Sequence, residues 1–174
     1  MSTGLLLLRI VVGLLLAAHG SQKLFGWFGG YGIAGTGGYL ESLGFKPGKA
    51  MAVVTGLAEV AGGVALAVGL LTPLAAAVVI GTMTVAAWTH AANGLWATAG
   101  GYELPFVYAV VGATLGFTGA GDFSLDHALG LSFGTGYGVA AIVLGLVAAA
   151  VNILRATSVQ RSTAVADDAL SVNA

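Results

Sequence analysis

The sequence predicts an all-α integral membrane protein, a helical bundle with a four-helix core and a fifth, C-terminal transmembrane helix. Of 174 residues, 57% are hydrophobic and only 7% are charged, whereas a soluble domain carries about 25% charged residues. Several apolar segments approach the roughly 20 residues that a membrane helix needs. The 29 glycines are typical of closely packed membrane helices, because small residues let helix backbones approach.

The five expected spans cover residues 5–25, 50–71, 74–93, 104–119 and 137–154. We assign residues 1–136 to the four-helix domain, 137–155 to the additional helix and 156–174 to a polar, disordered tail. A cleaved signal peptide is the alternative for the first segment. Arg9 interrupts its apolar stretch and no basic segment precedes it, so we expect the segment to be retained.

The segment at residues 26–49 is rich in glycine and aromatic residues, and a short interfacial helix is expected at residues 35–43. Its rings suit the headgroup level of a bilayer, where aromatic side chains anchor. They are Trp27, Phe28, Tyr31 and Tyr39.

Lys46 and Lys49 in this segment, and Arg155 and Arg161 after the fifth span, fall on one side of a five-span protein. The positive-inside rule places that side, with the C-terminus, in the cytoplasm. The high glycine and alanine content is typical of a bacterium with a GC-rich genome, so we expect a bacterial plasma membrane.

Several function classes are disfavoured. The net charge of −1 leaves no basic footprint for nucleic acid, and the absence of cysteine excludes thiol chemistry within this chain. The GxGxxG pattern at residues 30–35 follows a membrane helix rather than a strand, unlike a nucleotide fingerprint. Asp122, Asp126 and His127 can be read as metal ligands, but we expect no metal. Ser124 as the cap of a short helix, with Asp126 in its first turn, is the better interpretation.

Ionisable residues inside a bilayer cost about 2.5–3.5 kcal/mol each near a helix centre, so they are the candidates for ligand binding or proton relay. At about 1.5 Å per residue, His19 and Glu59 lie level near the midplane. Three more candidates lie near the cytoplasmic end: Lys23, His90 and Glu103. The alternatives are a snorkelling Lys23, helix-capping roles for His90 and Glu103, and a purely structural pairing of Glu59 with His19 or Lys23.

Arg9, Asp122 and Asp126 are the polar candidates on the opposite, outer side. Arg9 can bind a lipid phosphate or pair with Asp122, and a functional role is the open alternative. Gly112 and Gly116 form a GxxxG pattern that serves helix packing within the bundle or a homo-oligomer equally well.

The chain resembles the DoxX family. The resemblance lies in LRIVVG at residues 8–13, HGSQKLFG at 19–26, GLAE at 56–59, GLLTP at 69–73 and GAGDFSLD at 119–126. These motifs span roughly residues 5–130 in the family's order and spacing, with Pro73 where we expect a basic residue. The resemblance implies a four-helix membrane bundle. It also implies a redox role linked to quinone or sulfur, since relatives include a subunit of thiosulfate:quinone oxidoreductase.

Two functions follow. In the first, the protein is a membrane subunit of a redox system and binds a quinone between helices, with His19 and Glu59 as proton partners. Electrons then come from a redox partner subunit. In the second, the protein is not an enzyme and binds or transports a lipid, a small molecule or a partner protein, with residues 27–39 as the working surface. The sequence does not decide whether the protein is catalytic.

Overall fold

The computed structural model describes residues 2–172, with side chains to residue 165. This part of the chain is helical and contains no strand. Its α-helices are α1 (Ser2–Phe25), α2 (Gly32–Ser42), α3 (Gly48–Val68), α4 (Thr72–His90), α5 (Glu103–Thr118), α6 (Leu125–Ala128) and α7 (Thr135–Val172).

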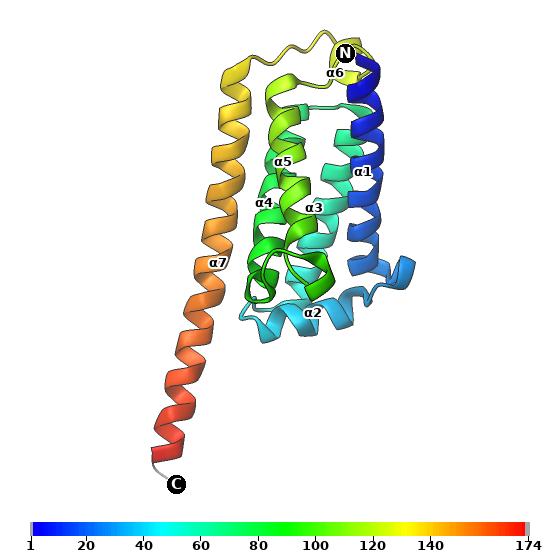
Figure 1. Cartoon of the computed structure of the whole chain (residues 1–174). Helices are drawn as coiled ribbons and strands as arrows, with labels where there is room; N and C mark the ends of the chain where they lie inside the picture. Colours follow the sequence, from blue (N-terminus) through cyan, green and yellow to red (C-terminus); the bar gives the residue numbers. More distant parts are fainter. Residues whose placement is uncertain (1, 173–174) are drawn as a thin grey trace.

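Helices α1, α3, α4 and α7 are long and apolar enough to cross a membrane. Helix α5 is apolar but has 16 residues, or about 24 Å, and it runs alongside them (Figure 1). The predicted all-α membrane bundle is confirmed, and the chain is a multi-pass membrane protein.

The core bundle is formed by α1, α3, α4 and α5, with α1 against α3, α3 against α4 and α4 against α5. Helix α7 packs outside it on α4 and α5. In Figure 1, α2 lies across one end of the bundle and α6 at the other. We call these ends the α2 side and the α6 side. The interfacial helix expected at residues 35–43 is present and begins earlier, at Gly32.

Helices α1 and α3 meet through a glycine seam, formed by Gly13 and Gly20 on α1 and Gly56 and Gly63 on α3. A Cβ atom added to Gly13 would lie 2.4 Å from the carbonyl oxygen of Gly63, and one added to Gly20 would lie 2.5 Å from that of Gly56. No larger residue fits without moving a backbone. In each helix the glycines are seven residues apart, or two turns, so they share one face.

The GxxxG glycines Gly112 and Gly116 face the interior of this protein. A Cβ atom on Gly112 would contact Val79 of α4 at 3.2 Å, and one on Gly116 would contact Ala76 at 3.5 Å. The pattern therefore serves packing of α5 on α4, the first of its two expected uses.

Helix α7 differs from expectation. We expected residues 156–174 to form a disordered tail, but the helix continues through them to Val172; Asn173 and Ala174 lie outside the described residues. The segment contains no glycine or proline to end the helix. It is also held at its start, where buried Ala156 packs with Phe45 and Gln160 Nε2 donates to the Leu43 carbonyl at 3.1 Å.

Candidate functional site

A charged pair joins α1 to α3 in the half of the bundle nearer the α2 side. Lys23 Nζ lies 2.5 Å from Glu59 Oε2 and donates a hydrogen bond to it. The Glu59 side chain is fully buried, while that of Lys23 is 26% exposed. The pair thus connects the bundle interior with the protein surface. Of the two partners named for Glu59 at the sequence level, the structure pairs it with Lys23.

The glycine seam accounts for this geometry. Gly20 precedes Lys23 by three residues and Gly56 precedes Glu59 by three. Because α1 and α3 run antiparallel, with Gly20 against Gly56, the two charged residues lie about one turn to either side of this contact. Because these glycines let the two backbones touch, the side chains bridge a short gap. Lys23 Nζ also approaches the His19 carbonyl at 3.5 Å, as expected for residues four apart on a helix.

Two further polar rings border the pair. The imidazole of His19 contacts the Tyr108 ring of α5 edge to face, with ring centroids 6.0 Å apart. His19 Nδ1 lies 3.0 Å from Gln22 Oε1 and is hydrogen-bonded to it. Both rings lie within Coulombic range of the Glu59 carboxylate. The site therefore draws on three helices.

The hydrogen-bonding capacity of the site is not used up. Glu59 Oε1 is buried and has no hydrogen-bond partner among the described residues. A buried polar atom without a partner costs about 1–3 kcal/mol, more when charged, so such an atom calls for an explanation. A bound polar group that donates to Oε1 would remove this cost. The arrangement can hold such a group and exchange a proton with it through the carboxylate or the imidazole.

Glu103 and His90, the other two candidates predicted near the α2 side, do not contact the Lys23–Glu59 pair. Glu103 is the first residue of α5, and its Oε2 accepts a hydrogen bond from the Ala97 backbone N–H at 2.9 Å. It braces the loop between α4 and α5. His90 ends α4 in a half-buried position, and its side chain makes no hydrogen bond or ion pair within the described residues.

The α6 side holds a second buried charge. Arg9 is fully buried and its Nη2 donates to the Phe123 carbonyl at 2.5 Å. Gly69 leaves the space that its guanidinium fills, since a Cβ there would lie 1.7 Å from Nη1. Burial removes Arg9 from contact with a lipid phosphate. The expected pairing with Asp122 is also wrong: Asp122 accepts a hydrogen bond from the Ser2 hydroxyl, and the acid within Coulombic range of Arg9 is Asp126.

Asp126 is buried and closes the turn between α3 and α4. Its carboxylate accepts hydrogen bonds from Leu71 N at 2.6 Å, Thr72 N at 3.0 Å and Thr72 Oγ1 at 2.6 Å. It therefore caps the N-terminus of α4, where a negative charge is favoured. Ser124 caps α6 as predicted, accepting from His127 N at 3.1 Å. Within the described residues no three metal-ligating side chains come together.

The aromatic loop, residues 25–31, is exposed on the α2 side. Phe25 and Trp27 pack with ring centroids 4.8 Å apart, and Trp27 and Phe28 with centroids 6.5 Å apart. Phe28 has a φ of 52°, in the left-handed region that non-glycine residues rarely occupy. Tyr31 is 84% exposed. Tyr39 lies apart on α2, and its hydroxyl donates to the Thr89 carbonyl at 3.4 Å.

Sequence reasoning missed Tyr108 and the glycine seam as parts of the site. A tyrosine inside an apolar helix is a signal of the same kind as His19, because its hydroxyl needs a partner when buried. The spacing of seven between Gly13 and Gly20, repeated between Gly56 and Gly63, would have indicated which faces of α1 and α3 meet.

Comparison with known proteins agrees with this architecture. No curated protein and no solved structure matches the chain. The family model described as DoxX matches residues 4–92 of the 174. The match includes Lys23, Glu59 and the whole glycine seam, whereas Tyr108 and the motif at residues 119–126 lie beyond it. The chain therefore belongs to the DoxX family.

Proposed function

We propose that this protein is the membrane subunit of a redox system and binds the head group of a quinone beside Glu59. The observation that carries the proposal is the buried Oε1 atom of Glu59, which lacks a partner and lies next to partly exposed His19 and Lys23. A quinone has carbonyl oxygens that need donors, and its reduced form has hydroxyl groups that need acceptors. Lys23 and Glu59 offer one of each.

The residues present fit such a ligand. Reduction of a quinone to a quinol takes two electrons and two protons. Carboxyl and imidazole groups are the usual side chains for proton delivery, and Glu59 and His19 would supply the two protons. The electrons would come from a redox partner subunit, because this chain has no cysteine for an iron–sulfur cluster. Membership of the DoxX family supports the redox assignment only at the level of resemblance to quinone-linked relatives.

The test is Glu59→Gln in the complex isolated from its own membrane. We expect loss of bound quinone, read by native mass spectrometry, and a decrease in quinone reduction of about 100-fold or more. Glu103→Gln is the matched control, since Glu103 lies outside the site. The double variant Lys23→Met/Glu59→Gln removes the unpaired lysine if the single variant is unstable. Unchanged quinone binding and turnover in folded Glu59→Gln protein would show that the proposal is wrong.

A second candidate function rests on the aromatic loop. Backbone strain such as that of Phe28 costs about 1–3 kcal/mol and clusters at functional sites, and here it presents an exposed ring. This supports a non-enzymatic protein that contacts a partner protein or lipid headgroups through Trp27, Phe28 and Tyr31. Changing all three to alanine should abolish recovery of a co-purifying partner while the bundle stays folded. Unchanged recovery would exclude this function for the loop.

We further propose a bacterial plasma membrane, with the α2 side in the cytoplasm. The basic residues Lys46, Lys49 and Arg155 support this orientation through the positive-inside rule. With a membrane-impermeant thiol reagent, Gly130→Cys should label in intact cells, and Lys49→Cys should label only after the membrane is permeabilised.

A further inference from the structure

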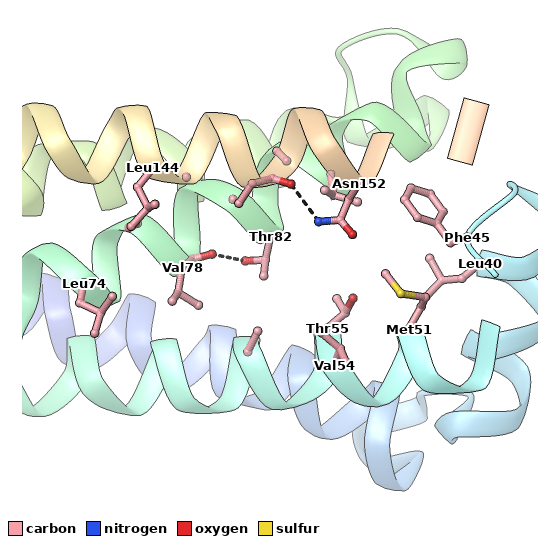
Figure 2. A pocket seen from close by; sticks show the side chains of 17 residues that line it. Leu40, Phe45, Met51, Val54, Thr55, Leu74, Val78, Thr82, Leu144 and Asn152 are labelled. Carbon is pink, nitrogen blue, oxygen red and sulfur yellow. Dashed lines mark hydrogen bonds between the residues drawn. The ribbon is translucent and has the colours of Figure 1, made fainter. Parts of the chain in front are cut away.

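A cavity unconnected with the Lys23–Glu59 site opens between α3, α4 and α7. Its volume is about 330 Å³. Helix α7 packs on α4 and α5. Residues of α4 form the floor of the cavity, and residues of α3 and α7 form its two walls (Figure 2). Along α4 the lining runs from Leu74 to Val85, or about 16 Å of helix. The cavity is therefore a groove about half as long as the hydrocarbon core is thick.

The polarity of this groove changes along its length. Its deep part is lined by aliphatic side chains, among them Leu74, Val78 and Leu144. Nearer the α2 side, Thr55 and Asn152 point toward each other from opposite walls (Figure 2). Asn152 Nδ2 donates to the Ala148 carbonyl at 2.8 Å. Within the described residues, neither Asn152 Oδ1 nor the Thr55 hydroxyl has a hydrogen-bond partner.

The end of the groove on the α2 side is bordered by positive charge. Lys46 follows the lining residue Phe45, and Lys49 precedes the lining residue Met51 by two positions. Phe45 packs with Ala156, so the segment that carries Lys46 lies against this part of α7. Arg155 comes directly before Ala156. Lys46, Lys49 and Arg155 are exposed.

One acid lies near these three cations. It is Glu41, whose carboxylate accepts a hydrogen bond from Gly48 N at 3.1 Å. A net positive mouth remains.

We propose that this groove binds one acyl chain of an anionic glycerophospholipid, with the phosphate at Lys46, Lys49 and Arg155. The order of polarity matches such a lipid. Cations flank the α2-side end, and Thr55 and Asn152 offer polar atoms one to two turns deeper, where the glycerol esters lie. Leu40, Phe45 and Met51 line the groove between these two levels, and aliphatic residues line its deep part. Asn152 is three residues, or about 4.5 Å, below Arg155. Basic clusters between transmembrane helices are known recognition sites for anionic headgroups.

The first test fills the groove without disturbing the packing. Ala148 lines it and is exposed, so Ala148→Phe should occupy the space of the chain. Ala150→Phe is the matched control, since Ala150 is exposed on the same helix and does not line the groove. Delipidated full-length protein is titrated with phosphatidylglycerol and read by native mass spectrometry. We expect about tenfold weaker binding for Ala148→Phe and wild-type binding for Ala150→Phe.

A second pair guards against misfolding of the first variant. Val54→Phe fills the groove from α3, and Leu57→Phe is its control, since both residues are more than half exposed and only Val54 lines the groove. Equal binding of phosphatidylglycerol by a folded groove variant and its control would overturn the proposal, because lipid would then be held by surface charge alone.

The second test removes the positive charges at the α2-side end of the groove, where the lipid phosphate is proposed to bind. Lys46→Gln/Arg155→Gln should weaken binding of phosphatidylglycerol by about 10- to 30-fold, at roughly 1 kcal/mol per basic residue. Binding of phosphatidylcholine with the same chains should stay unchanged. Arg161→Gln, two turns beyond the groove, is the control. An unaltered preference for phosphatidylglycerol over phosphatidylcholine in the double variant would refute the assignment of an anionic lipid.

Discussion

The two buried charged clusters of this protein use similar residues differently. On the α6 side, Asp126 accepts three hydrogen bonds from the start of α4. Buried Arg9 donates to the Phe123 carbonyl, and its Nε and Nη1 have no partner among the described residues. On the α2 side, Glu59 has one oxygen bonded and one without a partner, and Lys23 reaches the surface. The first cluster holds loops in place. The second joins a buried acceptor without a partner to a lysine that reaches the surface, and this access is the basis of the proposed function.

Asp126→Ala should have the largest effect on stability. It removes the cap of α4 and leaves Arg9 without its nearby acid, so we expect a loss of about 3–5 kcal/mol in the free energy of unfolding. Asp122→Ala is the control, because Asp122 is exposed and bonds only Ser2. Denaturant unfolding in detergent measures both. If the two variants unfolded alike, the α6-side cluster would not be the structural one.

Lys23→Met should come next, with a loss of about 2–3 kcal/mol, because it leaves the buried Glu59 carboxylate unpaired. The partial exposure of Lys23 makes the loss smaller than that for Asp126. The variant Lys23→Met/Glu59→Gln should recover most of it, since the charge is then gone. A double-mutant cycle measures the coupling. Additive losses would mean that the ion pair contributes nothing.

Gly63→Ala should destabilise the bundle by about 1–3 kcal/mol through overpacking. Its Cβ would lie 2.5 Å from the Gly13 carbonyl oxygen, so α1 and α3 must separate. Separation would also lengthen the contact between Lys23 and Glu59, and ligand binding should weaken with stability. Gly4→Ala is the control, because nothing lies within 4 Å of its added Cβ. Equal unfolding temperatures would contradict the role of the seam.

Ser124→Ala should have the smallest effect, about 1 kcal/mol, from loss of the cap on α6. Because α6 has only four residues, the change should stay local, with no effect on ligand binding at the α2 side. Hydrogen exchange of the His127 amide reports the cap directly. A change in ligand binding would show that the two clusters are coupled.

Much of the fold followed from sequence because hydrophobicity is a property of each segment. The long apolar runs identified the spans, and the polar residues within them identified the positions that require an explanation. The predicted cap at Ser124 and the interfacial helix before Lys46 also depended on local signals. The disordered tail was the exception. Its polar composition concealed a helix that Ala156 and Gln160 hold against the α2 side.

Pairing could not be predicted in the same way. Helical depth placed His19 level with Glu59 but did not show how far each helix is rotated about its axis. For α1 and α3 that rotation is set by the glycine seam, which brings Lys23 to Glu59. Glu103, on α5, bonds the loop that precedes its own helix. For Arg9 the partner came from a loop more than 100 residues away.

The sequence by itself determined that this is a helical membrane protein of the DoxX family type with ionisable residues in its spans, because composition and motif order are written in single segments. Only the tertiary structure decided which of those residues meet, which buried oxygen lacks a partner and where a groove opens beside α7. All three features depend on contacts between helices that are distant in sequence. Separating two helices by a few ångströms, or rotating one helix by the angle between adjacent residues, would change each of them.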